Sequence, residues 1–190
     1  DLLSKMLRFF MRKVVGKRAA FRPRLLVALP GGMAPSERQT LVDVLVDAGV
    51  RSVVPVDESV ASAIGAGMRI DQPYGRMNID IGGGRTNVSV FSFGHQIVWD
   101  ILPVGGDAFD DAIVDFMRKK HNLLIGARTA EELKIHIGAA RMRGAKLTMN
   151  ACGRSLVSGL PRAVTVTSDE MIEALDEPLR DLISALHRII

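Results

Sequence analysis

Cysteine and clustered metal ligands are what this 190-residue sequence most clearly lacks. Cys152 is its only cysteine, so no disulfide can form within the chain, and a lone cysteine favours a reducing compartment. The histidines lie far apart without the spacing of metal ligands; they are His95, His121, His136 and His187. We therefore expect no structural metal and a cytoplasmic location.

Aromatic residues are also scarce, at 5% of the chain, and they do not form the aromatic-glycine pattern of an RNA-stacking sheet. The formal net charge of +4 is a moderate basic excess, which does not by itself indicate nucleic acid. No apolar segment is long enough to span a bilayer. The sequence thus predicts no nucleic-acid partner and no membrane-spanning helix.

What the chain does have is enough apolar sequence, 47%, to bury a core in one domain or two small ones. Near its start, Leu2, Met6 and Phe10 recur at helical spacing among lysines and arginines. A basic amphipathic helix of this kind can lie on an anionic membrane or pack on its own sheet, and both interpretations remain open here.

A glycine hairpin between residues 76 and 104 is the most informative stretch. Met77, Ile79 and Ile81 alternate with polar residues as in a half-buried strand, and a second strand-like segment follows the turn Gly82-Gly83-Gly84. A turn without side chains lets backbone N–H groups approach phosphate oxygens directly, and Asp80 beside it can hold a hydrated cation. The alternative is a flexible hairpin turn without a ligand.

The flanking segments predict an α/β fold. A strand at residues 25–29, a helix capped by Ser36, and a strand at 51–56 suggest a right-handed crossover, with the first strand buried on both faces. Short strands between residues 146 and 166 predict a small antiparallel lobe. Ser168 should cap a final helix, which Pro178 is expected to break or kink near Glu177.

Several segments together resemble the MreB-type bacterial actins, within the superfamily of actin, sugar kinases and heat-shock chaperone ATPases. They are D-I-G-G-G-R-T at 80–86, R-P-R-L-L-V-A-L-P at 22–30, S-E-R-Q at 36–39, A-S-A-I-G-A-G at 61–67, V-G-G-D-A-F-D-D-A-I at 104–113, A-E-E-L-K-I-H-I-G at 130–138 and G-L-P-R at 159–162. The resemblance covers nearly the whole chain.

The resemblance implies an actin-like (ribonuclease H-like) ATPase fold, with mixed sheets flanked by helices and a small antiparallel inserted lobe. Residues 1–69 would form the second half of a first domain and residues 70–125 the core of a second. Residues 126–167 would form the inserted lobe and residues 168–190 the return helix. The resemblance also favours packing of the first helix on its own sheet. It further implies that the chain is a fragment lacking the family's N-terminal phosphate hairpin and its late glycine-rich loop.

ATP and magnesium are the implied cofactors, and the implied site residues follow from the matched motifs. Glu37 would position the attacking water, Asp80 would hold magnesium through water, and Glu131 and Lys134 would grip the ribose and the adenine. The remaining nucleotide-binding candidates are Gly82, Gly83, Gly84, Thr86, Gly105, Gly106 and Asp107.

Four of the polar candidates also have a structural explanation. Glu37 suits the positive end of a helix dipole, and Asp107 is a natural helix N-cap. Glu131 and Lys134 can form a surface ion pair, three residues apart on a helix. Arg85 and Asn87 replace the threonine and glutamate that are usual in the family after the glycines, so Arg85 either contacts phosphate or blocks the pocket.

The implied function is that of an ATP-binding, filament-forming protein of cell-shape determination, with self-association as its main interaction. The inner-membrane surface and cell-wall morphogenesis proteins are further implied partners. The alternatives are a sugar- or acetate-kinase-like phosphotransferase and a non-hydrolysing actin-like scaffold. We expect ATPase activity in the complete protein and none in a fragment.

Overall fold

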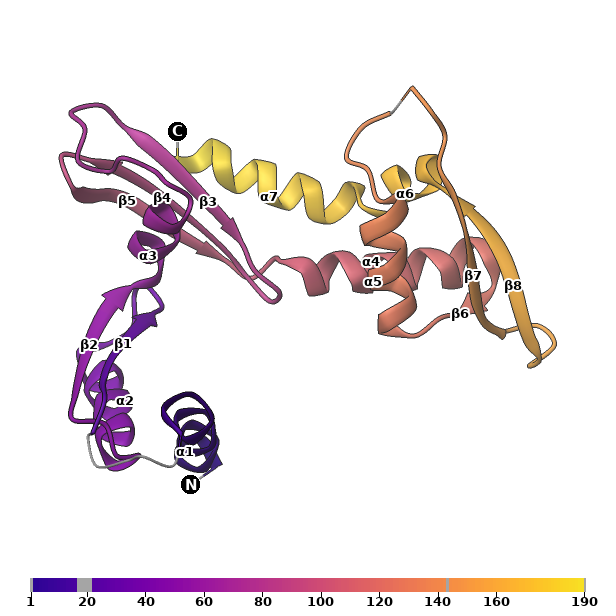
Figure 1. The fold of residues 1–190 in the computed structure, drawn as a ribbon. Helices are drawn as coiled ribbons and strands as arrows, with labels where there is room; N and C mark the ends of the chain where they lie inside the picture. Colours follow the sequence, from indigo (N-terminus) through magenta and orange to yellow (C-terminus); the bar gives the residue numbers. More distant parts are fainter. Residues whose placement is uncertain (1, 17–21, 143, 190) are drawn as a thin grey trace. The chain divides into compact units, whose positions relative to one another are not determined.

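The computed structural model describes residues 2–16, 22–142 and 144–189, with no side-chain description for Leu3 and Val15. The chain divides into two compact units. One comprises Asp1–Asn78 and Ser89–Trp99, and the other Ile79–Val88 and Asp100–Ile190 (Figure 1). Within the described ranges, no helix is long and apolar enough to cross a membrane.

The first unit contains a strand-helix-strand crossover, as the sequence predicts. Strands β1 (Arg24–Leu29) and β2 (Ser52–Asp57) pair in parallel and are connected by helix α2 (Pro35–Asp47). Helix α3 (Glu58–Gly65) follows directly. Helix α1 (Leu2–Val15) packs on α2, where Arg8 donates a hydrogen bond to the carbonyl of Asp47 at 2.8 Å.

Two sequence-based expectations for this unit require correction. Ala34, not Ser36, is the N-cap of α2, because Pro35 takes the first helical position, which suits its fixed φ. Strand β1 is not buried on both faces: Leu26 is 66% exposed, whereas Leu29 is buried. Helix α1 contacts α2, and its Phe9 is 62% exposed.

A three-stranded sheet follows, in the order β3 (Arg76–Ile81), β4 (Thr86–Ser92) and β5 (His95–Leu102). The predicted glycine turn connects β3 to β4. Strand β4 begins directly after this turn with four consecutive buried residues, from Thr86 to Ser89. Their burial holds this end of the strand in place. The turn is exposed to solvent at all three of its glycines, Gly82, Gly83 and Gly84.

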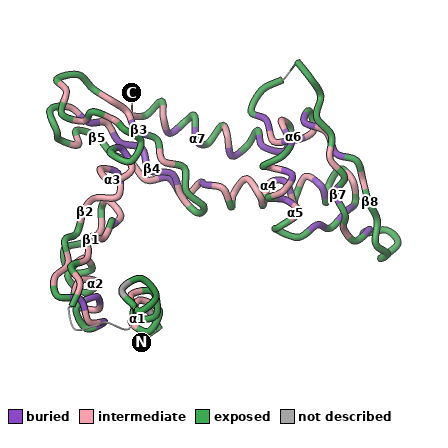
Figure 2. The backbone as a smooth tube through the Cα atoms, in the orientation of Figure 1, coloured by how far each residue is buried: buried purple, intermediate pink, exposed green. Residues whose placement is uncertain are grey.

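The second unit has a core built from helices and a small sheet. Helices α4 (Gly106–His121) and α5 (Ala127–Ile137) pack against each other, and β6 (Leu123–Leu124), β7 (Thr148–Ser155) and β8 (Pro161–Thr167) form an antiparallel sheet. Buried residues of this core lie on these elements and on helix α6 (Ser168–Ala174) (Figure 2). They include Ile113, Met117, Leu123, Leu133, Val166 and Met171.

The predicted helical end of the chain is divided in two. Helix α6 (Ser168–Ala174) ends before Leu175, and α7 (Asp176–Ile189) begins directly after it. Pro178 lies in the first turn of α7, where its missing N–H is tolerated. The predicted break therefore occurs, slightly before Glu177, but Thr167 rather than Ser168 is the N-cap of α6.

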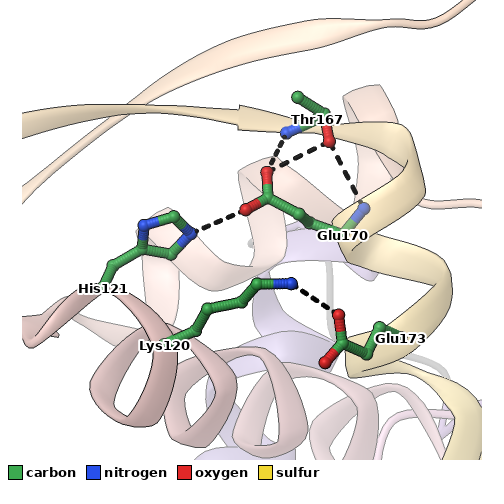
Figure 3. Close-up of polar contacts among 5 residues, drawn as sticks. All are labelled: Lys120, His121, Thr167, Glu170 and Glu173. Carbon is green, nitrogen blue, oxygen red and sulfur yellow. Dashed lines mark hydrogen bonds and ion pairs between the residues drawn. The ribbon is translucent and has the colours of Figure 1, made fainter.

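A capping box fixes the start of α6. Glu170 accepts hydrogen bonds from the backbone N–H of Thr167 at 2.9 Å and from its hydroxyl at 3.0 Å, and its other oxygen contacts His121 Nε2 at 2.9 Å (Figure 3). Partial burial acts to raise the pKa of Glu170, but the hydrogen bonds from Thr167 and His121 outweigh it and lower that pKa. Ionised Glu170 therefore stabilises the contact between α4 and α6.

Replacing Glu170 with alanine should lower the free energy of unfolding of the second unit by about 1–2 kcal/mol, the scale of a lost cap with its hydrogen bonds. Because the folded-state pKa is lowered, this contribution is present above the ordinary glutamate pKa of about 4.3 and is lost as the pH falls through the folded-state value. Urea unfolding followed by circular dichroism at neutral and acidic pH measures both effects.

Glu173→Ala is the matched control. Glu173 lies on the same helix and pairs with Lys120, but its side chain is 63% exposed (Figure 3). Exposed pairs contribute little, so this variant should unfold within about 0.5 kcal/mol of the wild type. Equal losses in the two variants at neutral pH would argue against the capping-box explanation.

Candidate functional site

Two glycine loops of the second unit are joined directly by their backbones. Gly106 N–H donates to the carbonyl of Gly82 at 2.9 Å, and Asp107 N–H donates to the carbonyl of Gly83 at 2.8 Å. The first loop is the turn between β3 and β4, and the second forms the start of α4. The sequence predicted both loops as parts of one nucleotide site, and the structure places them in contact.

The contact depends on the absence of a side chain at Gly105. A Cβ atom there would lie 2.4 Å from the carbonyl oxygen of Gly83 and 2.6 Å from that of Gly82. Real Cβ atoms do not approach backbone oxygens so closely, and both obstacles are backbone atoms that cannot rotate away. Gly105 is therefore required by the packing of the two loops, whatever ligand they bind.

Thr86 holds the second glycine loop through a side-chain hydrogen bond. Its side chain is fully buried, and its hydroxyl donates to the carbonyl of Val104 at 2.7 Å. The sequence suggested that Thr86 contacts phosphate. In this structure its hydroxyl proton is already used to hold the loop that begins at Val104.

Two carboxylates lie near the glycine turn. Asp80 is half-buried on β3, two residues before Gly82. The carboxylate of Asp107 is 3.6 Å from the position that a Cβ on Gly83 would take. Asp107 lies in the first turn of α4, but Gly105 is the N-cap, so the capping role suggested for Asp107 is not what the structure shows.

These two carboxylates suit a cation that binds carboxylate and phosphate oxygens at the same time. In the described ranges, no group of three or more histidine, cysteine or acidic side chains could hold a metal ion. Magnesium keeps several waters and is commonly bound through one or two carboxylates together with phosphate oxygens. The donor set therefore fits hydrated magnesium that arrives with a nucleotide.

Lys134 contacts the second glycine loop rather than Glu131, which lies three residues before it on α5. Its Nζ donates to the carbonyl of Gly106 at 2.9 Å and to Asp110 Oδ2 at 2.7 Å. Glu131 is exposed, and the part of the chain that the structure describes contains no ion pair between Glu131 and Lys134. The surface-pair explanation of these two residues is therefore not supported.

Asp110 was missed as a site residue by the sequence analysis. A carboxylate near the start of a helix is favourable beside the helix dipole without any partner, so its sequence position indicates no ion pair. It lies 24 residues before Lys134, so no helical spacing links the two. Only the packing of α4 against α5 reveals the pair.

Glu37 belongs to the first unit, where it lies in the first turn of α2. Its side chain is exposed, and Oε2 accepts a hydrogen bond from the backbone N–H of Ala34 at 3.0 Å. This bond satisfies a free donor at the start of α2, which explains the residue locally. A second oxygen remains for other contacts.

Comparisons with known proteins identify the family of this chain. The family model described as MreB/Mbl protein matches residues 1–190. The cell shape-determining protein MreB of Escherichia coli strain K12 is 39% identical over 185 residues, which are 96% of this chain and 53% of that protein. The chain thus spans about half the length of the curated relatives that it matches.

Solved structures give the same result for the fold. MreB5 of Spiroplasma citri bound to ADP superimposes with a TM-score of 0.90 at 29% identity, over 98% of this chain and 57% of that one. The same protein bound to AMPPNP gives 0.89. A double helical filament of MamK gives a TM-score of 0.75 at 15% identity, over 98% of this chain and 55% of that one, which supports the fold alone.

Proposed function

Because the chain belongs to the MreB/Mbl family and has its actin-like fold, we propose that it forms part of an ATP-binding, filament-forming protein that determines cell shape. The observation that carries the proposal is the backbone pairing of the two glycine loops around Gly105. It leaves an exposed turn without side chains beside Asp80, which suits phosphates and their magnesium ion.

Residue roles follow from this geometry together with the family. Gly83 and Gly84 would offer backbone N–H groups to the phosphates, and Asp80 would orient hydrated magnesium. The N–H of Gly82 donates to the carbonyl of Arg85 at 2.9 Å, so Gly82 would shape the turn rather than bind phosphate through that group. Glu131 is exposed on α5, which makes its carboxylate available to ribose hydroxyls. Glu37 would direct water to the γ-phosphate through the oxygen that does not cap α2.

The related structures support the choice of ligand and the assembly. MreB5 is bound to ADP in one structure and to AMPPNP in another, and MamK forms a filament. We propose ATP with magnesium as the ligand and a second copy of the protein as the main partner. We also propose the inner-membrane surface and cell-wall morphogenesis proteins as partners, and the domain limits at 69/70, 125/126 and 167/168.

Calorimetry, phosphate release and sedimentation of the protein at its natural length test the proposal. We expect magnesium-dependent ATP binding at about micromolar affinity, and pelleting that requires ATP. Binding and pelleting without phosphate release would identify a non-hydrolysing scaffold. ATP turnover that requires an added sugar or acetate, without pelleting, would indicate a phosphotransferase. Failure to bind ATP at millimolar concentration would refute the proposal.

A further inference from the structure

One ammonium group connects helix α5 to the glycine loops. Lys134 extends from α5 to the first residue of α4, where it binds the carbonyl of Gly106, and to Asp110 one turn further along α4. A Cβ on Gly106 would come within 3.3 Å of Lys134 Nζ, so the ammonium lies directly against the loop.

The ion pair is well shielded but only partly satisfied. The side chains of Lys134 and Asp110 are 24% and 14% exposed. Asp110 Oδ1 is buried, and the described residues provide no hydrogen-bond partner for it. Removing two charges from water is costly, and the cost is recovered only when all their polar atoms find partners. Stability alone therefore gives a poor account of this pair.

The pair continues into the contact between the loops. Lys134 binds the carbonyl of Gly106, while the N–H of the same residue donates to Gly82 at 2.9 Å. The next N–H, of Asp107, donates to Gly83. The Lys134 ammonium thus holds Gly106, and the N–H of Gly106 joins α4 to the exposed glycine turn.

We propose that Asp110 and Lys134 are positioning residues for the phosphate turn. Asp110 orients Lys134, and Lys134 holds Gly106 so that Gly82 and Gly83 stay in the phosphate-binding arrangement. Lys134 then acts on the phosphate side of the ligand through the backbone, in addition to the nucleoside contact that the family motif implies. The inference rests on the proposed nucleotide function and gives α5 a part in it.

The binding test uses Asp110→Asn and Lys134→Met in the protein at its natural length, with magnesium ATP and magnesium tripolyphosphate as ligands. Tripolyphosphate has no nucleoside, so a defect on the phosphate side must weaken both ligands. We expect each variant to lose about tenfold in affinity for both. Loss of ATP affinity with unchanged tripolyphosphate affinity would mean that Lys134 acts through the nucleoside alone, and would overturn the proposal.

Asp115→Asn is the matched control. Asp115 also lies on α4, and it pairs with Arg118, but both side chains are about half exposed. The substitution removes the same charge from the same helix without touching the loops. Both ligands should bind this variant within twofold of the wild type.

Amide hydrogen exchange without ligand gives a second, independent result. The Gly106 and Asp107 amides should exchange about tenfold faster in Asp110→Asn and Lys134→Met, because their bonds to Gly82 and Gly83 loosen. The Leu175 amide, which bonds to Met171, should be unchanged if the core remains folded. Unchanged exchange at Gly106 and Asp107 would refute the positioning role. A wild type that binds neither ligand would instead refute the nucleotide function, and exchange would still decide whether the ion pair holds the loops.

Discussion

Replacing Gly105 with alanine should weaken the affinity for nucleotide by at least about a hundredfold. The new Cβ would lie 2.4 Å from Gly83 O, 2.6 Å from Gly82 O and 2.7 Å from Arg85 N. The start of α4 and the glycine turn must then separate, and the bonds from Gly106 and Asp107 are lost. A turn that is no longer held cannot present its N–H groups together, and misplaced groups contribute little to phosphate binding.

Calorimetry with magnesium ATP measures this loss, and circular dichroism checks that the fold persists. Gly126→Ala is the control, because Gly126 is the N-cap of α5 as Gly105 is of α4, and a Cβ at Gly126 meets nothing within 4 Å. The two substitutions change helix capping alike. If Gly105→Ala retained wild-type affinity, the paired loops would not be the phosphate site.

Replacing Asp80 with asparagine should remove the magnesium dependence of ATP binding. The amide has almost the same size as the carboxylate but no charge to orient the waters of a magnesium ion. Affinity for ATP in the presence of magnesium should fall by at least about tenfold. In a chelator the variant should bind ATP at least as well as the wild type, because a carboxylate beside phosphate is repulsive.

Titration of each protein with ATP, with magnesium and then with a chelator, makes the comparison. Asp100→Asn is the control, since Asp100 lies on β5 and its carboxylate accepts a hydrogen bond from the N–H of Ile101. Its magnesium dependence should match that of the wild type. Retained magnesium dependence in Asp80→Asn would place the cation elsewhere.

The elements that could be predicted are those encoded by neighbouring residues. Strand β3, the triple-glycine turn and the crossover between β1 and β2 all appear where the sequence indicated them. The burial along β3 is the reverse of the prediction, because Asn78 is buried where its amide donates to the Ser62 hydroxyl at 2.6 Å, whereas Ile79 and Ile81 are 42% and 51% exposed. The predicted antiparallel hairpin also forms as β7–β8, with residues 156 and 157 in its turn. Periodicity and turn residues report such local structure directly.

The details at helix starts were less predictable. The sequence favoured Ser36, Asp107 and Ser168 as N-caps, whereas the structure uses Ala34, Gly105 and Thr167. Capping preferences are modest, and the neighbouring residues decide between them. Pro35 fixes the start of α2, and the close approach of two loops leaves room only for glycine before α4.

By itself, the sequence determined the family, the order of strands and helices, and the glycine positions of the candidate site, because local patterns and motif spacing carry that information. The tertiary structure alone decided that Lys134 pairs with Asp110 rather than Glu131, that Thr86 holds Val104, and that Gly105 must lack a side chain. These contacts join residues distant in the sequence. The packing of α4 on α5 and on the glycine turn determines them, and no periodicity along the chain reports such packing.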